Sequence, residues 1–194
     1  MSNERYAHTL RVADTAVNLA EKWDSDRQRA YVAAIFHDVA KFLNPEKLSE
    51  MNIISTPFLD NLYQKYRAIW HSFAGPAIMK HFFKINDPKT LSAARWHTTG
   101  KAKMSKLEQI VYMADAIEPG RDFSGIAYLR DLSFKNLDHA TYAQSHAILE
   151  SLLVQALPIH PYSIQCRNYY LNLISKQEIL LIHAQLKYQE VTNQ

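Results

Sequence analysis

The sequence predicts an all-α fold, a helical bundle formed by a single domain of residues 1–194. Apolar residues recur at spacings of three and four along most of the chain, and no segment alternates apolar with polar residues as a half-buried strand does. Hydrophobic residues make up 47% of the 194 residues, whereas Gly (4) and Pro (7) are few. A chain of this length can bury a core of its own without disulfides.

The first two predicted helices lie before Asn44-Pro45. Residues 4–23 carry an apolar stripe, and His8 lies on that apolar face. Asp26 is expected to cap the second helix, and Asn44-Pro45 is expected to end it. Alanines and His37 form one stripe of the second helix, so His37 is expected to point into the core.

The middle of the chain predicts shorter elements. Turns and short helices are expected up to Trp70, because periodicity is weak there. Longer helices are expected over residues 71–83, 88–97 and 104–118. Asp87 and Pro88 are typical of the start of a helix. Thr98-Thr99-Gly100 is typical of the end of one. The stripe of the third of these helices includes Asp115, so a carboxylate is expected to face inward.

The last third predicts three further helices, over residues 126–132, over residues 135–157, and after His160-Pro161. We expect the core helices, which carry the candidate metal site, to lie within about residues 4–131 and the C-terminal helices within about residues 135–190. No Gly/Ser/Pro-rich linker divides these two parts, so both are assigned to one domain.

Charge and cysteine content exclude several classes of protein. The net charge of the chain is only +3, and the 22 Lys and Arg residues are spread along the sequence. A nucleic-acid partner is therefore not expected. Cys166 is the single cysteine, which rules out an internal disulfide and suits a small buried hydrophobe. Neither a signal peptide nor an apolar stretch of membrane-spanning length is found, so we expect a cytoplasmic protein without a membrane partner.

The adjacent His37 and Asp38 are the most informative residues of the chain. They follow the apolar run Ala-Ala-Ile-Phe, on the face that should be buried. Burying an imidazole and a carboxylate costs several kcal/mol unless both are paired or coordinated. A divalent metal would remove this cost, so the pair indicates a metal site.

Other residues extend this pair to a candidate ligand set. Four of the nine histidines and two aspartates lie at or near the ends of predicted helices. The candidate ligands are His8, His37, Asp38, His71, His97 and Asp115. Imidazole and carboxylate together suit Fe, Mn or Zn, and the absence of thiolates argues against a zinc finger.

The order His, His-Asp, Asp resembles the HD-domain metal-dependent phosphohydrolases. The flanking segments are similar to the YqeK subfamily, whose members are symmetrical bis(5′-nucleosyl)-tetraphosphatases. These segments are Arg5-Tyr6-Ala7-His8-Thr9, His37-Asp38-Val39-Ala40-Lys41, His97-Thr98-Thr99-Gly100 and Ala114-Asp115-Ala116-Ile117-Glu118-Pro119-Gly120-Arg121. His160-Pro161 and Arg167-Asn168-Tyr169-Tyr170 also resemble that subfamily, so the likeness covers nearly the whole chain.

The resemblance implies an HD-domain helical bundle with a divalent metal centre. It makes His8, His37, Asp38 and Asp115 the core ligands, with Asp38 as a bridge. His71 and His97 match histidines that complete a second site in dinuclear members. The resemblance therefore implies a dinuclear centre and favours Fe, with Mn, Zn, Co or Mg as the alternatives.

The same resemblance implies a reaction. A metal-activated hydroxide would attack a central phosphate of diadenosine tetraphosphate and release two ADP. Asp38 and Lys41 would be catalytic, and the nucleotide would contact Lys41, Thr98, Thr99, Gly100 and Arg121. The short segment before Arg5 leaves an open edge that would either change substrate access or support a homodimer.

Competing interpretations remain open at this point. The chain could be another HD-domain nucleotide phosphohydrolase, acting on a mononucleotide or a signalling nucleotide, or a non-catalytic metal- and nucleotide-binding module. Thr98 and Thr99 could bond their own backbone, and Glu118 could orient Arg121 or hold it structurally. Trp96 and Tyr112 could stack on a base or pack in the core. The remaining histidines are expected to make only local contacts.

Overall fold

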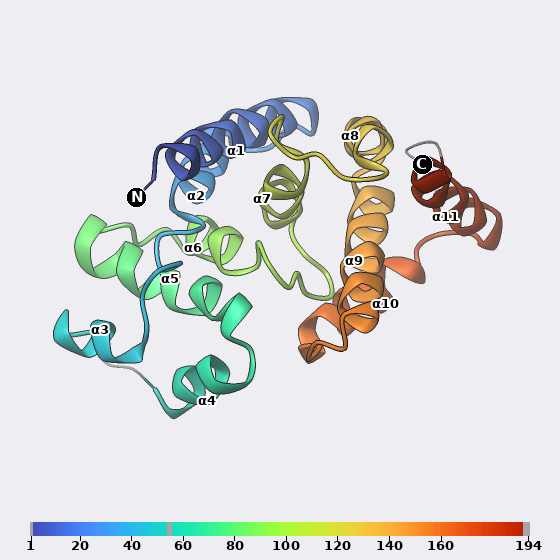
Figure 1. Ribbon diagram of the computed structural model, residues 1–194. Helices are drawn as coiled ribbons and strands as arrows, with labels where there is room; N and C mark the ends of the chain where they lie inside the picture. Colours follow the sequence, from blue (N-terminus) through green and yellow to red (C-terminus); the bar gives the residue numbers. More distant parts are fainter. Residues whose placement is uncertain (1, 54–55, 192–194) are drawn as a thin grey trace.

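The computed structural model describes residues 2–53 and 56–191, and all regular elements in these ranges are α-helices (Figure 1). The all-α prediction is therefore confirmed. The helices are α1 (Asn3–Lys22), α2 (Arg27–Phe36), α3 (Pro45–Glu50), α4 (Pro57–Lys65), α5 (Arg67–Phe83), α6 (Pro88–Arg95), α7 (Lys106–Ile117), α8 (Ile126–Lys135), α9 (Leu137–Val154), α10 (Pro161–Leu171) and α11 (Lys176–Val191).

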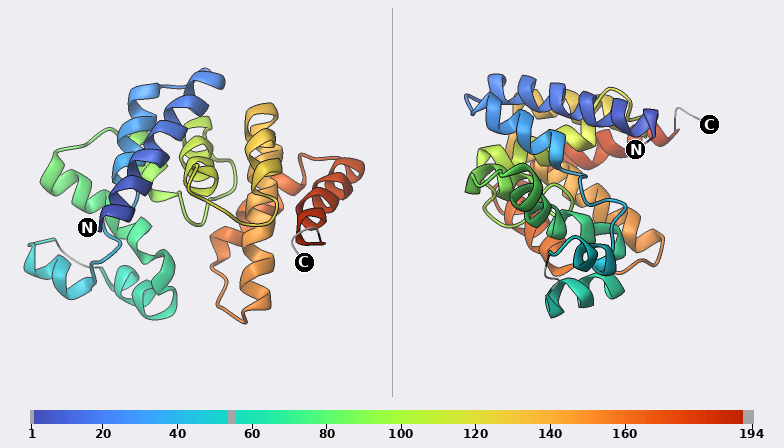
Figure 2. Two further views of the ribbon diagram at one scale, coloured as in Figure 1. Left: turned by 45° about the horizontal axis from the view of Figure 1, so that its top comes forward. Right: turned by 90° about the vertical axis from the view of Figure 1, so that its left-hand side faces the viewer.

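Helix α7 lies at the centre of the bundle. It contacts α1, α2 and α6 on one side and α8 and α9 on the other (Figure 1). Helices α1 and α2 pack along each other, and they lie at the opposite end of the molecule from α3 and α4 (Figure 2). Helix α5 reaches from the α3–α4 end to α6. Side chains from α1, α2, α5, α6 and α7 can therefore meet beside α7.

Short polar residues and prolines explain where the helices begin. The side chain of the residue before each of seven helices accepts a hydrogen bond from a backbone N–H of the first turn. These caps are Ser2, Asp26, Asn44, Thr56, Asp87, Ser105 and Asn136. At α7, Ser105 and Glu108 form a reciprocal capping box, which fixes the start of the central helix.

Two apolar clusters hold the helices together. The larger contains fully buried alanines of α1 and α2, whose small side chains allow close helix approach, and the buried residues of α7. The smaller surrounds Trp70 and joins α3, α4 and α5. Val39 packs against both clusters, so the segment after α2 lies between them.

The second helix is shorter than the sequence predicted. It ends at Phe36, and residues 37–43 form successive turns in which a backbone N–H bonds the carbonyl three residues earlier. Val39 bonds Phe36 at 3.1 Å and Lys41 bonds Asp38 at 2.9 Å in this manner. His37 and Asp38 therefore lie just beyond the helix, where the tighter turn turns both side chains toward α7.

Other boundaries differ from the prediction by smaller amounts. Helix α5 begins at Arg67, four residues earlier than expected, and α6 ends at Arg95. The final segment forms two helices, α10 and α11, with a break around residues 172–175. Among the described residues, no helix combines the length and the hydropathy needed to cross a bilayer.

Candidate metal centre

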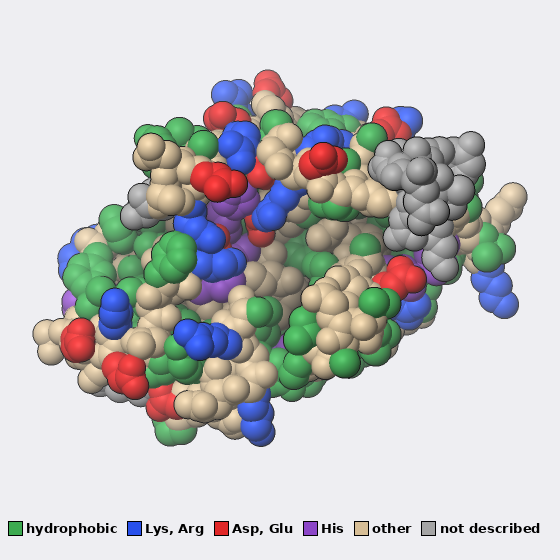
Figure 3. Space-filling view, in the orientation of Figure 1, with side chains coloured by type: hydrophobic (Ala, Val, Ile, Leu, Met, Phe, Trp, Pro, Cys, Tyr) green, Lys and Arg blue, Asp and Glu red, His purple; other side chains and the backbone are tan. Residues whose placement is uncertain are grey.

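The six predicted ligand residues lie together beside α7. They come from α1 (His8), the turns after α2 (His37, Asp38), α5 (His71), the turn after α6 (His97) and α7 (Asp115). They form three overlapping groups, and the nitrogen and oxygen atoms of each group lie within 4.8 Å of one another. Figure 3 shows histidine side chains in a hollow bordered by Lys and Arg side chains.

His37 and His97 are directed into the cluster by the ends of two helices. The Nδ1 of His37 donates to the carbonyl of Ala34 at 2.6 Å, and the Nδ1 of His97 donates to the carbonyl of Ala94 at 2.7 Å. Carbonyls in the last turn of a helix lack helical partners, which makes them available here. Because Nδ1 carries the proton, the Nε2 of each ring presents a lone pair to the cluster.

The buried lone pairs of the cluster fit a cation. The Nε2 of His37 and the Oδ1 of Asp38 are buried and have no hydrogen-bond partner of good geometry within the described part of the chain. Such an unpaired group costs about 1–3 kcal/mol. Burial lowers the pKa of His37 to about 4, so the ring is neutral near pH 7 and able to ligate. Neutral imidazoles beside carboxylates are a suitable donor set for a divalent metal.

Asp38 lies between the two halves of the cluster. Its Oδ1 is 3.0 Å from Nε2 of His71 and 3.6 Å from Nε2 of His97, while its Oδ2 is 2.8 Å from Nη1 of Arg5. The Nζ of Lys41 is 3.3 Å from Oδ1. Burial alone would raise the pKa of Asp38, but the close approach of the His71 and His97 imidazoles outweighs it and holds the pKa well below its usual range. The carboxylate is therefore ionised.

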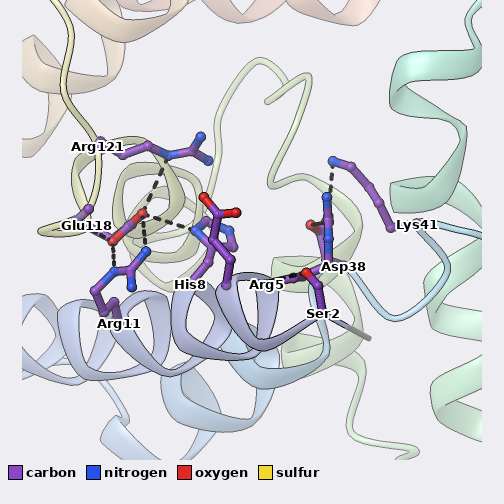
Figure 4. A pocket seen from close by; sticks show the side chains of 10 residues that line it. Ser2, Arg5, His8, Arg11, Asp38, Lys41, Glu118 and Arg121 are labelled. Atoms are coloured by element: carbon purple, nitrogen blue, oxygen red, sulfur yellow. Dashed lines mark hydrogen bonds and ion pairs between the residues drawn. The ribbon is translucent and has the colours of Figure 1, made fainter.

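His8 is held by a second carboxylate, that of Glu118. The Nδ1 of His8 donates to Oε1 of Glu118 at 3.1 Å, and its Nε2 lies 3.3 Å from Oδ1 of Asp115 (Figure 4). Glu118 is only 2% exposed and also accepts from Nε of Arg11 at 2.5 Å and from the Gly120 backbone at 2.6 Å. Burial opposes ionisation of Glu118, yet the bonds from Arg11 and His8 lower its pKa to about 2.

The sequence interpretation missed this arrangement. It paired Glu118 with Arg121, whose Nε is 4.0 Å away, whereas His8 and Arg11 are the close partners. It also gave no role to Arg5 or Arg11. A signal was present, because Arg5, His8 and Arg11 are spaced three apart and therefore lie on one side of α1.

A pocket lined by charged side chains lies over the cluster. Its volume is about 350 Å³, and its wall includes the cations Arg5, Arg11, Lys41 and Arg121 together with the carboxylates of Glu4, Asp38 and Glu118. In Figure 4, Arg121 and Lys41 lie at opposite ends of the pocket, with His8 and Arg5 between them. Arg121 is tied to Asp115 through Nη2 at 2.6 Å from Oδ1. We call this the phosphate pocket, because guanidinium and ammonium groups recognise phosphate.

The predicted substrate residues after His97 are placed differently from one another. Thr98 is half-buried, and its hydroxyl lies 2.8 Å from that of Ser72. Thr99 is buried and donates to the carbonyl of Gly100. Gly100 is buried against Cys166, and its φ of +59° is in the left-handed region. Neither Thr99 nor Gly100 lines the phosphate pocket, so backbone geometry explains both.

Two aromatic residues with open roles belong to the packing. Tyr112 is 2% exposed and belongs to the larger apolar cluster. Trp96 packs edge-to-face with Tyr162 at 4.9 Å and lies under Arg95. Cys166 is buried as expected, and burial raises the pKa of its thiol to about 12. His160 caps α10, outside the cluster.

Comparison with known proteins locates these features within a family. The HD domain matches residues 5–120, a range that contains all six predicted ligands. Proteins of Staphylococcus aureus and Bacillus subtilis described as "Bis(5′-nucleosyl)-tetraphosphatase, symmetrical" are similar to the chain at 35% and 33% identity. The alignments cover 88% and 83% of this chain and 88% and 86% of those proteins.

A solved structure is also similar. It is described as a predicted HD superfamily hydrolase involved in NAD metabolism from Clostridium acetobutylicum. The TM-score is 0.81 at 33% identity, and the match covers 90% of this chain and 92% of that one. The fold of the described helices is thus shared with that solved structure over about nine-tenths of each chain.

Proposed function

Because this chain belongs to the HD-domain family, we propose that it is a metal-dependent hydrolase that cuts dinucleoside tetraphosphates into two nucleoside diphosphates. The observation that carries the proposal is the cluster of six metal-binding side chains beneath a pocket walled by Arg5, Arg11, Lys41 and Arg121. The names of the Staphylococcus aureus and Bacillus subtilis relatives support this substrate class and the symmetrical cut.

We infer that the cluster holds two divalent ions, with iron favoured by family resemblance. The overlap of the three ligand groups supports two ions, because His37, Asp38 and His97 each belong to two groups. His8 and Asp115 would complete the first site, and His71 the second. When bound, divalent ions supply Lewis acidity: they activate water near neutral pH and polarise phosphoryl oxygens.

The protein's own side chains would position a polyanion and absorb its charge. Hydrolysis of the middle anhydride adds one water molecule to a central phosphorus, breaks the bridging P–O bond and leaves two nucleoside diphosphates. Lys41 and Arg121 lie at the two ends of the phosphate pocket and would neutralise oxygens on either side of the bond that breaks. Arg5 and Lys41 also bracket Asp38, which fixes the direction of its carboxylate.

A product assay tests the proposal. Metal-loaded protein incubated with diadenosine tetraphosphate should yield ADP as the only nucleotide product. ATP together with AMP would contradict the symmetrical cut, and no cleavage would contradict the proposed reaction.

The Asp38→Ala variant separates catalysis from a purely structural metal site. It should abolish turnover while helicity by circular dichroism stays close to that of the wild type, and the metal-free variant should melt close to the metal-free wild type. Asp14→Ala, on an exposed position of α1, is the matched control and should retain activity. Equal activity of Asp38→Ala and the control would argue against Asp38 as a ligand.

A second candidate substrate comes from the Clostridium acetobutylicum structure, whose description places that protein in NAD metabolism. NAD and its mononucleotide precursors also contain a phosphate ester or a pyrophosphate, so the same cluster could serve them. Specificity constants measured side by side for NAD, mononucleotides and diadenosine tetraphosphate distinguish these candidates. We expect the tetraphosphate to give the highest value.

A further inference from the structure

Two more cavities open beside the metal cluster. The first, here called the α7–α9 cavity, has a volume of about 290 Å³ and lies between α7, α9 and the segment after α7. The second, the α4–α5 cavity, has a volume of about 200 Å³ and lies between α4, α5 and the turns after α2. The first includes the ligands His97 and Asp115 in its wall, and the second includes His71.

The phosphate pocket adjoins both cavities, because it shares one lining residue with each. Arg121 lines the phosphate pocket and the α7–α9 cavity. Lys41 lines the phosphate pocket and the α4–α5 cavity. Since Arg121 and Lys41 lie at opposite ends of the phosphate pocket (Figure 4), the two cavities flank it on opposite sides. A ligand with a charged centre and two less charged ends matches this layout.

The α7–α9 cavity has the chemistry of a nucleobase site. The Phe123 side chain is 41% exposed, and Ile148 is only half-buried, so both offer apolar surface to a ligand. The carboxamide of Gln144 also lines the cavity and makes no hydrogen bond to the described part of the chain. An aromatic face beside a free carboxamide can stack on a base and bond its polar edge.

The α4–α5 cavity is walled by aromatic rings and a guanidinium. The Arg67 guanidinium lies 5.2 Å from the centre of the Tyr63 ring, and Arg67 is exposed. Phe42, at the rim, is 69% exposed. Arg guanidinium planes and aromatic rings both stack on bases, and neither demands one particular base.

We propose that the α7–α9 cavity and the α4–α5 cavity are the two nucleoside sites of the enzyme, one for each end of the dinucleoside substrate. The proposal rests on the proposed function. It gives a structural reason for a symmetrical cut: with a nucleoside held on either flank, the middle of the phosphate chain lies over the metal cluster. Phe123 and Gln144 would bind one base, and Tyr63 and Arg67 the other.

Two exposed substitutions test the two sites separately. Phe123→Ala and Arg67→Ala should each lower kcat/KM for diadenosine tetraphosphate by roughly 5- to 150-fold, the range expected for loss of stacking on one base. Phe134→Ala on α8 and Arg27→Ala on α2 are matched controls outside all three cavities and should keep the wild-type value. Melting curves of all four variants should stay near that of the wild type.

Calorimetry with ADP provides a measurement that does not depend on turnover. The wild-type holoenzyme should bind two ADP per chain, and Phe123→Ala and Arg67→Ala should each weaken a different one of these two sites. The double variant should weaken both. A single ADP site, no ADP binding, or two sites unchanged in the variants would overturn the proposal.

The outcomes separate this proposal from the proposed function. If the wild type cleaves diadenosine tetraphosphate and neither variant changes kcat/KM or ADP binding, the reaction assignment stands and the nucleoside sites are wrong. If the wild type binds two ADP, the variants weaken them, and diadenosine tetraphosphate is not cleaved, the nucleoside sites stand and the reaction assignment is wrong.

Discussion

At the level of single residues, three histidines of the cluster are oriented by a group that accepts a hydrogen bond from their Nδ1–H. For His37 and His97 the acceptor is a helix-end carbonyl, and for His8 it is the carboxylate of Glu118. Carbonyls and ionised carboxylates cannot donate, so each ring is fixed with Nε2 toward the cluster. Glu118 differs from the other two acceptors because a substitution can remove it without altering the backbone.

We therefore predict that Glu118→Gln weakens metal binding and turnover. The amide keeps a hydrogen-bond acceptor for His8 but loses the charge that pairs with His8 and Arg11. Loss of such an outer carboxylate typically costs 10- to 100-fold in metal affinity or activity, and we expect a loss on the order of tenfold here. Competition with a metal indicator measures the loss of metal affinity. Glu21→Gln, at an exposed position of α1, should bind metal as the wild type does.

The same carboxylate predicts a pH dependence of stability. The pKa of Glu118 is about 2 in the folded protein and near 4.5 when unperturbed. A lowered folded pKa adds stability above the unperturbed value, and this stability is lost as the pH falls toward the folded value. The free energies of unfolding in urea of the metal-free wild type and of metal-free Glu118→Gln should therefore differ most above pH 4.5. A difference that grows below that pH would contradict the assignment.

At the level of elements, the site depends on where helices stop. Helices α2 and α6 both end just before a histidine of the cluster, His37 and His97 respectively. After α6 the chain turns through Gly100, whose φ is +59° and whose added Cβ would lie 2.5 Å from the sulfur of Cys166. The turn thus anchors the end of α6 against α10.

Gly100→Ala is predicted to destabilise the protein. It combines left-handed backbone strain with a clash against a buried side chain, together worth about 1–3 kcal/mol. Thermal or urea unfolding measures the loss. Gly75→Ala in α5 is the control, because its Cβ would find ordinary contact with Val39 at 3.6 Å and alanine favours the helix. If both variants unfold alike, packing at Gly100 is not what fixes this turn.

The sequence predicted most elements but not their ends. Periodicity locates α1 and α7 well, because one face of each is strongly apolar. It extends α2 too far, since Val39 and Ala40 continue the apolar pattern although Val39 packs against both clusters and Ala40 belongs to the smaller one. Periodicity records that a residue is buried, not which neighbour buries it, so the change from helix to turns at His37 has no local signal.

At the level of the whole molecule, the centre depends on five segments meeting at once. We predict that removing metal with a chelator abolishes activity and lowers the melting temperature, and that adding metal back restores both. Ligands that bind only the folded state stabilise it, by about 2.7 kcal/mol at a concentration of 100 times Kd. Unchanged melting after verified metal removal would contradict a metal site that joins these segments.

The number of ions is testable by one substitution. If two ions are held, His71→Ala should lower the metal content by one ion per chain, because His71 belongs to only one of the three ligand groups. His81→Ala, at an exposed position of the same helix, should keep the full content. Elemental analysis of purified protein gives both values. An unchanged content in His71→Ala would contradict a role for His71 as a ligand.

The residues that form the cluster could be predicted from the sequence, whereas the residues that support them could not. Chemistry identifies His37 and Asp38 because a buried imidazole next to a carboxylate is costly, and the motif order then adds His8 and Asp115. These residues do lie together, while their role as ligands remains a prediction. The contact between Glu118 and Arg11 was not predicted, because it joins residues 107 positions apart and the spacing of Arg5, His8 and Arg11 indicates only that these three share a side of α1.

The distance along the chain between the two halves of the centre also constrains how the protein is made. His8 and Glu118 are hydrogen-bonded partners 110 residues apart. At ribosomal rates of about 5–20 residues per second, roughly 5 to 20 s separate the synthesis of these two residues. During that interval His8 has neither Glu118 nor Asp115 to hold it. An ion held by all six candidate ligands can therefore be bound only after α7 has emerged from the ribosome, and a nascent chain stalled earlier presents only part of this set.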